Sequence, residues 1–239
     1  MELRMYERLS RVYDLDWGDF ALQYVDLIEE LLTRESNHIA HILDIACGTG
    51  TLLIELVRRG HSGFGIDQSP EMIERARNKA KGLPNIGFGV QNITGLHMSG
   101  GFDLITCTFD SLNYVIKMEK VQKVFHGVAL HLRNQGYFIF DSNTYRQYMN
   151  NHNFAQAYEL NGVQFIQRMK YDPQKRLART VFEFSSGERE VHVQRPYGFS
   201  ELKPMLKRAG LNVVHKYAGF KGERFTLKSE RLICITQKA

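Results

Sequence analysis

Short apolar runs alternate with amphipathic stretches along most of the chain. The apolar runs predict buried strands at residues 42–46, 63–67, 86–90, 102–108, 137–141, 211–219 and 232–236. Helical spacing of apolar residues follows Gly50, starts again after the cap Ser69, and returns at 117–132 and 200–209. Strands that alternate with helices predict an α/β fold, a doubly wound, seven-stranded, mostly parallel sheet with helices on both faces.

Two segments depart from this alternation. Residues 6–32 carry a helical apolar pattern with an interruption near 13–18, which predicts two N-terminal helices. After residue 141, apolar alternation at 158–171, 177–184 and 190–195 without intervening helices predicts three antiparallel strands. The expected organisation is a helical lid at 1–40, a cofactor-binding domain at 41–144 and 200–239, and an insertion at 145–199 that roofs the site or forms a dimer contact.

The richest chemistry lies between the first and second predicted strands. Gly48 and Gly50 form a turn in which backbone can approach a ligand, and Asp67 ends the second strand. A strand-end acid can accept hydrogen bonds from both ribose hydroxyls of an adenosine group. A dinucleotide fingerprint needs glycine or alanine at position 53, where Leu53 stands, and Asp44 would face a pyrophosphate unfavourably but pair with an ammonium group.

The pattern Asp44-x-x-Cys47-Gly48-Thr49-Gly50 with Asp67 resembles the first motifs of class I, seven-stranded, Rossmann-like S-adenosylmethionine-dependent methyltransferases. Four further runs, at 12–14, 108–114, 136–141 and 192–197, resemble a bacterial subgroup of small-molecule methyltransferases that includes sugar-amine N-methyltransferases. The resemblance implies S-adenosylmethionine as cofactor, with S-adenosylhomocysteine as product. One departure is Asn92, where the family commonly has aspartate accepting from the adenine amino group; an asparagine oxygen can accept the same bond.

The expected site residues are those of the motifs and of the carboxyl ends of the strands, where ligands bind in open α/β sheets. For the cofactor they are Tyr13, Asp44, Ala46, Cys47, Gly48, Gly50, Asp67, Gln68, Met72, Asn92, Ile93, Phe109 and Asn113. For the substrate they are Tyr6, Trp17, Asn113, Arg195 and Tyr197. The catalytic candidates are Asp110, Asp141 and His192.

Each role has a structural alternative. Asp44 could stabilise its turn, Met72 and Ile93 could be core residues, and Asp110 could cap the helix that follows it. Asp141 could bind the backbone of residues 143 and 144. His192 lies on an alternating strand, where a packing role is common, and the aromatic residues near the N-terminus could pack on the sheet instead of closing over the cofactor.

Composition narrows the partners and the location. The net charge of +5 is dispersed without a block of five basic residues, so nucleic acid is not favoured as a partner. No apolar stretch reaches the roughly 18 residues of a membrane span, and no signal-peptide core opens the chain, so a cytoplasmic protein is expected. A homodimer through the insertion remains open.

No metal is expected. Cys47, Cys107 and Cys234 form no C-x-x-C pair, and His38 and His41, one helical turn apart, are expected to face solvent. A Mg²⁺ site built from Asp110 and Asp141 stays as an alternative.

Methyl transfer from a sulfonium group requires alignment and desolvation more than strong acid or base chemistry. The absence of a conspicuous base slightly favours a small-molecule nitrogen acceptor over oxygen. Two other hypotheses are a methyltransferase acting on RNA or protein, and a non-catalytic cofactor-binding or dimerisation module.

Overall fold

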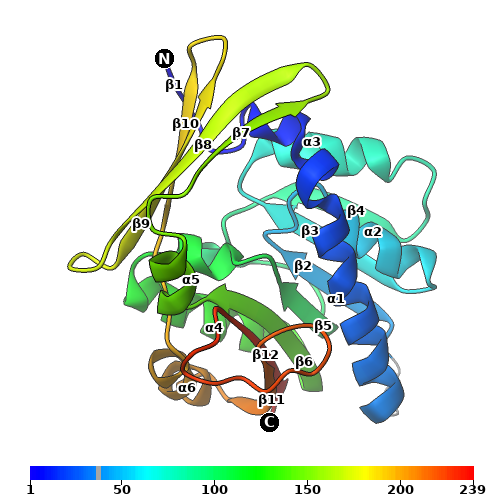
Figure 1. Ribbon diagram of the computed structural model, residues 1–239. Helices are drawn as coiled ribbons and strands as arrows, with labels where there is room; N and C mark the ends of the chain where they lie inside the picture. The colour runs from blue at the N-terminus through cyan, green and yellow to red at the C-terminus, as the bar shows by residue number, and fades with distance from the viewer. Residues whose placement is uncertain (36–38) are drawn as a thin grey trace.

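A computed structural model describes residues 1–35 and 39–239 and places the strands in two sheets (Figure 1). The first sheet has the order β11-β12-β6-β5-β2-β3-β4. Its strands are β2 (His41–Ile45), β3 (Ser62–Asp67), β4 (Ile86–Val90), β5 (Phe102–Cys107), β6 (Leu132–Asn143), β11 (Leu211–Tyr217) and β12 (Arg231–Lys238). The five strands from β6 to β4 are parallel, and β12 and β11 add antiparallel neighbours. The predicted seven-stranded, mostly parallel sheet is confirmed.

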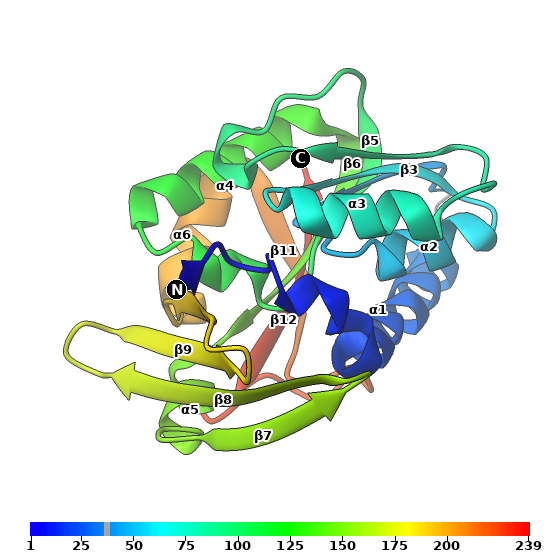
Figure 2. The same ribbon diagram turned by 90° about the horizontal axis from the view of Figure 1, so that it is seen from above.

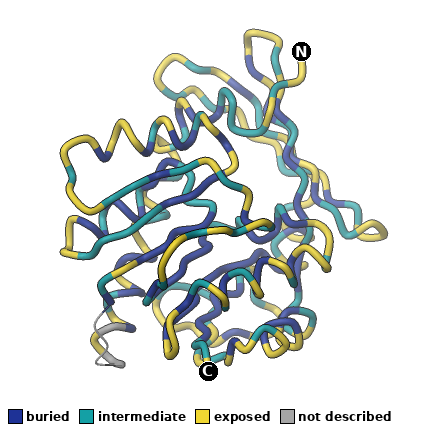
Figure 3. Tube along the Cα trace, turned by 180° about the vertical axis from the view of Figure 1, so that it is seen from behind, coloured by how far each residue is buried: buried dark blue, intermediate teal, exposed yellow. Residues whose placement is uncertain are grey.

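Helices cover both faces of this sheet because its strands are apolar on both sides. One face carries α1 (Tyr13–Glu35), α2 (Thr51–Arg58) and α3 (Pro70–Lys79), and the other carries α4 (Met118–His131) and α6 (Phe199–Arg208). Successive strand residues enter opposite cores: Ile42 packs with α1 and α2, whereas Leu43 packs with α4. Figure 3 shows the buried central strands between the more exposed outer segments.

The second sheet stands beside the first (Figures 1 and 2) and has the order β1-β10-β9-β8-β7. Its strands are β1 (Glu2–Leu3), β7 (Ala155–Leu160), β8 (Val163–Asp172), β9 (Leu177–Phe184) and β10 (Arg189–Gln194). Along β9, Thr180 and Phe182 are buried while Arg179 and Glu183 are exposed, as the alternation predicts. The predicted antiparallel insertion is therefore present, and it also contains the helix α5 (Tyr145–Asn150), which the pattern did not indicate.

One predicted strand of the insertion is wrong. Residues 158–171 were expected as a single strand, but β7 and β8 form a hairpin joined by Asn161 and Gly162. Both residues have positive φ, 48° and 76°, as a two-residue hairpin turn with Asn-Gly requires. The turn dipeptide outweighs the continuous apolar alternation on either side of it.

The N-terminal region also differs from the prediction. A short 3₁₀ turn, η1 (Leu9–Arg11), precedes α1, which runs without a break through residues 13–18. The predicted interruption is wrong because Gly18 is accommodated inside the helix, and Asp14 and Asp16 lie in its first turn, where negative charge is favourable.

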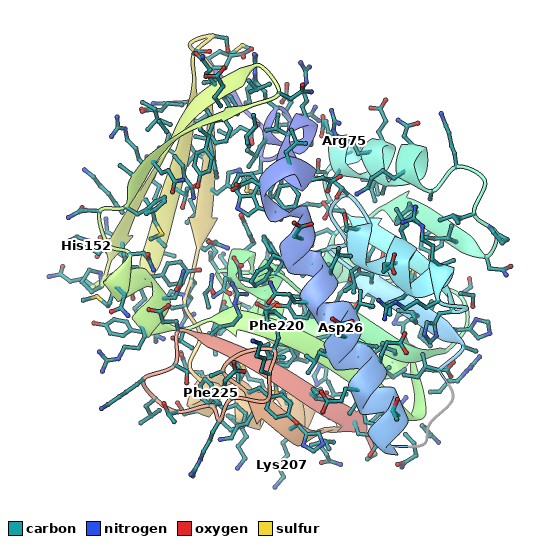
Figure 4. All side chains as sticks on the ribbon, turned by 45° about the vertical axis from the view of Figure 1, so that its right-hand side comes forward. Asp26, Arg75, His152, Lys207, Phe220 and Phe225 are labelled. Atoms are coloured by element: carbon teal, nitrogen blue, oxygen red, sulfur yellow. The ribbon has the colours of Figure 1, made fainter. Side chains whose placement is uncertain are left out.

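The loop between β11 and β12 returns to α1. Its residue Phe220 lies against that helix (Figure 4), with its ring centroid 4.7 Å from that of Tyr24 and 5.3 Å from that of Phe20. His41 is exposed, as expected, but it begins β2 and is not part of a helix; His38 lies outside the described residues. No helix in the described part of the chain is long and apolar enough to cross a membrane.

Candidate active site

A cavity of about 270 Å³ lies at the carboxyl ends of β2, β3 and β5, where loops lead from these strands to the next helices. The turn after β2 forms one wall. Ala46 and Gly48 there have positive φ, 60° and 54°, and the Gly48 amide donates to Asp67 Oδ2 at 3.0 Å. The glycine turn and the acid of β3 are thus tied together.

Asp44 lies at the bottom of this cavity and is only 2% exposed. Thr106 Oγ1 on the neighbouring strand β5 donates to its Oδ1 at 2.7 Å. Burial raises the pKa of Asp44 to about 7, the Thr106 hydrogen bond opposes this, and the nearby Asp67 adds to it. Among the described residues no Lys, Arg or His forms an ion pair with this carboxylate, and a cationic ligand group would stabilise its charged form.

Asp67 bridges two backbone segments. In addition to Gly48, the amide of Ser69 donates to its Oδ1 at 2.8 Å. Burial raises the pKa of Asp67, whereas these amide hydrogen bonds lower it. One carboxylate therefore orders the glycine turn and the start of α3 while it faces the cavity.

Gly50 has a structural role instead of the expected ligand contact. It does not line the cavity, and its φ of 76° lies in the left-handed region. A Cβ at this position would come within 2.8 Å of the Phe88 ring and 3.1 Å of Ala76. The glycine is required for packing of the turn against β4 and α3.

The other end of the cavity is lined by Gln68, Met72, Asn92 and Ile93. The Asn92 oxygen accepts from the Thr94 amide at 2.9 Å and caps the 3₁₀ turn η2 (Ile93–Gly95), while its amide donates to Gln68 Oε1 at 3.1 Å. This corrects the expectation of an adenine contact through that oxygen, because Thr94 Oγ1 also donates to it at 2.7 Å.

A second cavity, of about 440 Å³, adjoins the first. It lies between α1, α5 and the strands β8, β9 and β10. Five aromatic side chains line both cavities: Tyr6, Tyr13, Trp17, Phe109 and Tyr114. We refer to these five residues as the aromatic junction.

Local backbone strain positions one side of the junction. Phe109 and Asp110 both have positive φ, 62° and 48°, a conformation that non-glycine residues seldom adopt. Asp141, fully buried on β6, accepts from the Asp110 amide at 3.1 and 3.0 Å and stabilises this turn. The centroid of the Phe109 ring then lies 6.0 Å from that of Tyr13 and 4.7 Å from that of Phe20.

The second cavity contains a charged cluster. The Arg231 guanidinium is hydrogen-bonded to Asp141 and lies 3.6 Å from Asp110, and Gln194 donates to Asp110 Oδ2 at 2.6 Å. Burial raises the pKa of Asp110 to about 6, with Arg231 opposing the shift and Asp141 adding to it. Arg231 occupies the space between the two carboxylates, so the alternative of a Mg²⁺ site there is not supported.

Four further expected site residues lie elsewhere among the described residues: Asn113, Asp141, Arg195 and Tyr197 line neither cavity. Asn113 is fully buried and joins Asn143 to the Arg195 carbonyl, with amide hydrogen bonds of 2.9 and 2.7 Å. Tyr197 is buried and donates to the Val115 carbonyl, and Arg195 pairs with Glu201 at 3.2 Å. These side chains join the segments that follow β5, β6 and β10, which meet beside the cavities. His192, in contrast, lines the second cavity.

Comparisons with known proteins agree with this geometry. Residues 42–136 match the family model described as a methyltransferase domain. The putative methyltransferase YqeM of Bacillus subtilis is 30% identical over 248 residues, which cover 98% of each chain. A crystal structure of an S-adenosylmethionine-dependent methyltransferase from Clostridium acetobutylicum is 26% identical, with a TM-score of 0.85 over 98% of this chain and 99% of that one. The chain belongs to the S-adenosylmethionine-dependent methyltransferases.

A shorter match links this methyltransferase to an enzyme named for its amine substrate. The dTDP-3-amino-3,4,6-trideoxy-alpha-D-glucopyranose N,N-dimethyltransferase of Streptomyces venezuelae is 26% identical over 134 residues, or 54% of this chain and 55% of that one.

The first cavity of the methyltransferase fits S-adenosylmethionine. Asp44 would face the ammonium group of the amino acid tail, and Asp67 the ribose hydroxyls, since both carboxylates line the cavity on neighbouring strands. Ala46, Cys47 and Gly48 form the turn between them. Met72 and Ile93 would contact the adenine ring, and the aromatic junction lines the same cavity as Asp44.

The methyltransferase is expected to bind S-adenosylmethionine more tightly at pH 8 than at pH 6. The pKa of Asp44 is raised to about 7, so below that pH its carboxyl is mostly neutral and must lose a proton before it pairs with an ammonium group. The association constant should rise by up to about tenfold per pH unit below pH 7 and level off above it. Calorimetry at several pH values measures this, and Asp44→Asn should flatten the dependence. A wild-type Kd that is constant from pH 6 to 8 would contradict the assignment.

The sequence did not assign a role to several residues that build the site. Tyr114 belongs to the run 108–114, but no spacing in the sequence indicated that its hydroxyl group lies at the junction. Asp14 accepts from Thr49 and Thr51 at 2.5 and 3.2 Å and pairs with Lys79 at 2.7 Å, which fastens α1 to the cofactor cavity. The partners of Asp14 in these contacts are 35 to 65 residues away in the chain, so no local pattern could indicate them.

Proposed function

We propose that this methyltransferase transfers a methyl group from S-adenosylmethionine to a nitrogen atom of a small molecule held in the second cavity. The observation that carries this proposal is that the two cavities meet at the aromatic junction. A donor in the first cavity and an acceptor in the second would face each other across these rings.

The dimensions of the second cavity favour a small acceptor. Its volume of about 440 Å³ falls within the range of sites that enclose small ligands. Its walls include four aromatic side chains from three elements: Trp17 and Phe20 of α1, Tyr148 of α5 and Phe182 of β9. A nucleic acid or a folded protein could reach such a site only with a single inserted side chain or base.

The charges of the second cavity favour a basic nitrogen. Among its lining residues the carboxylates are Asp16 and Asp110, and the only Lys or Arg is Arg231, whose guanidinium is already bound to the buried Asp141. An ammonium group would find an unbalanced carboxylate and several aromatic faces, both of which stabilise cations. A phosphate or carboxylate near the reacting atom of the acceptor would instead be repelled by these carboxylates and would find no free cation to pair with among the lining residues.

The residues described here act by alignment and exclusion of water. When bound, S-adenosylmethionine supplies an electrophilic methyl carbon on a sulfonium group. Tyr13, Trp17 and Phe109 of the junction exclude water from the space between donor and acceptor. Holding the nitrogen in line with the methyl group converts the transfer into an effectively unimolecular step, which accounts for a large part of the acceleration.

The comparison with the N,N-dimethyltransferase of Streptomyces venezuelae supports a nitrogen acceptor, since that enzyme is named for methylating an amino sugar. The proposal is tested by incubating the protein with S-adenosylmethionine and matched pairs of acceptors, such as 2-phenylethylamine with 2-phenylethanol and tryptamine with tryptophol. We expect S-adenosylhomocysteine and a methylated product with the amines. Methylation of the alcohols alone, or of no acceptor in such a panel, would contradict nitrogen methylation of this class.

The Asp110→Asn variant is expected to raise KM for an amine acceptor by at least about tenfold, because a hydrogen bond to a charged group contributes about 1.5 to 3 kcal/mol. The kcat should change much less, since Asp110 does not line the cofactor cavity. Steady-state kinetics with the best amine of the panel measure both constants. Asp172→Asn, at the end of β8 and outside both cavities, is the matched control and should leave KM unchanged. A fall in kcat alone would contradict a binding role.

A further inference from the structure

A chain of hydrogen-bonded side chains leads from the aromatic junction into the second sheet. Tyr6 Oη lies 2.8 Å from Tyr114 Oη, which lies 2.9 Å from His192 Nδ1. His192 Nε2 lies 3.3 Å from Glu190 Oε2. The four residues come from the N-terminal segment, from the 3₁₀ turn η3 (Ser111–Tyr114) and from β10, so their alignment is a product of the fold.

Glu190 is the fixed end of this chain and is fully buried. The backbone amides of Tyr6, Arg8 and Leu9 donate to its carboxylate at 2.8, 2.6 and 2.9 Å. Three N–H donors replace the water that a carboxylate loses on burial and stabilise its negative charge. The carboxylate can then only accept a hydrogen bond from the imidazole.

This fixes the direction of every hydrogen bond in the chain. Because Glu190 only accepts, His192 Nε2 carries the hydrogen, and in the neutral ring Nδ1 is an acceptor. Tyr114 therefore donates its hydroxyl hydrogen to Nδ1 and accepts from Tyr6. The Tyr6 oxygen is left with a free lone pair at the junction, where the acceptor nitrogen would lie.

The surroundings of His192 suit a transient positive charge. The centroid of its ring lies 4.7 Å from that of Tyr6 and 4.9 Å from that of Phe182, and His192 is 2% exposed. The titratable groups facing it are Glu190 on its own strand, Tyr114 of η3 and Tyr6, with Asp110 elsewhere on the wall of the same cavity. Burial raises the pKa of both tyrosines above the ordinary value, so a proton would pass along their hydroxyls without leaving a stable tyrosinate.

We propose that Tyr6, Tyr114, His192 and Glu190 form a proton relay that deprotonates the acceptor ammonium group, an inference that rests on the proposed amine methylation. The ammonium N–H bond breaks and its proton goes to Tyr6 Oη, as the Tyr6 proton goes to Tyr114 Oη and the Tyr114 proton to His192 Nδ1. The nitrogen keeps the electron pair, which then forms the new bond to the methyl carbon while the sulfur–carbon pair returns to sulfur. The imidazolium pairs with Glu190, and after product release its proton returns through Tyr114 and Tyr6 to water that enters the cavity.

The relay is matched to nitrogen chemistry. In water an alkylammonium ion and an imidazolium ion differ by about 4 pKa units, whereas water, as a stand-in for an aliphatic hydroxyl, lies about 9 units above imidazolium. The other acid near the junction, Asp110, lines the second cavity but not the first, so it is placed to pair with the bound ammonium group on the side away from the methyl donor.

A spectroscopic experiment tests the relay without any acceptor. The protein is labelled with ¹⁵N-histidine and its imidazole nitrogens are recorded by NMR with S-adenosylhomocysteine added. We expect His192 as the neutral Nε2–H tautomer, with an Nδ1 signal shifted by hydrogen bonding that moves toward the unbonded position in Tyr114→Phe. A hydrogen on Nδ1 of wild-type His192, or an Nδ1 signal insensitive to the Tyr114 hydroxyl, would overturn the proposal.

A kinetic experiment tests its use. The rate of S-adenosylhomocysteine formation with 2-phenylethylamine is measured from pH 6 to 10 for the wild type, Tyr6→Phe, Tyr114→Phe and Tyr137→Phe. The first two variants keep their rings and should lose about 10²-fold or more in kcat at pH 7, the usual scale for general base catalysis. They should approach the wild-type rate near pH 10, where the free amine is already present. Tyr137 lies in the core outside both cavities, so Tyr137→Phe should follow the wild-type profile.

The outcomes separate the relay from the proposed function. A pH-independent loss in Tyr114→Phe, or no loss, would show that the hydroxyl chain is structural. If wild-type protein methylates no amine, the proposed function fails, and the histidine tautomer still decides whether the relay is assembled as described. The Kd for S-adenosylmethionine, measured by calorimetry for each variant, checks that the cofactor cavity is intact.

Discussion

Replacing Arg231 with methionine is expected to lower the free energy of unfolding by about 3 to 5 kcal/mol, because it leaves the buried carboxylate of Asp141 without its cation. Asp110 also loses the group that opposes its raised pKa. Urea denaturation followed by far-ultraviolet circular dichroism measures the loss. The matched control is Arg224→Met, which removes an exposed arginine from the preceding loop and should change stability by less than about 0.5 kcal/mol.

The loss in Arg231→Met should depend on pH. Without the cation, the raised pKa of Asp110 in the folded state rises further above the unfolded value, so the folded state binds more protons than the unfolded chain. The variant is then least destabilised near pH 5 and most destabilised near pH 8. An equal loss at both pH values would show that packing of the long side chain, and not charge, is what Arg231 contributes.

Asp67→Ala is expected to weaken binding of S-adenosylmethionine by about 1.5 to 3 kcal/mol, or roughly 10- to 150-fold in Kd. The substitution removes the carboxylate that would meet the ribose hydroxyls and also releases the amides of Gly48 and Ser69 that shape the turn. Calorimetry at pH 8 measures the affinity.

Asp103→Ala is the control for the purely structural part of this effect. Asp103 also accepts from two backbone amides, those of Ala40 and His41 at 3.0 and 2.9 Å, but it lines neither cavity. It should cost stability without changing Kd. If both variants weakened binding equally, the role of Asp67 would be that of a fold-stabilising acid alone.

The sequence was informative where function depends on neighbours in the chain. The strand, glycine turn and strand-end acid lie within one βαβ unit, so Asp44, Gly48 and Asp67 could be placed together from spacing alone. The two cores follow from strands that are apolar on both faces. The dipeptide Asn161-Gly162 is also a local turn signal, and it, not the apolar alternation around it, decides the hairpin.

The second cavity could not be predicted in the same way. Arg231 is 90 residues from Asp141, Gln194 is 84 from Asp110, and Glu190 is 184 from the Tyr6 amide it binds. Asn113 and Tyr197 are buried and Arg195 is half-buried, because all three join the loops that surround the site. Their polar side chains led to the expectation of ligand contacts. Tertiary packing decides instead how far they are buried and which groups they bind.

Glu190 receives the amides of Tyr6, Arg8 and Leu9, and this has a consequence for biosynthesis. At about 5 to 20 residues per second, the ribosome makes Glu190 on the order of 10 to 40 s after Tyr6. Throughout that interval the amides of the N-terminal segment lack the carboxylate that they bind in the folded chain. The N-terminal segment is therefore translated early and reaches its final position late.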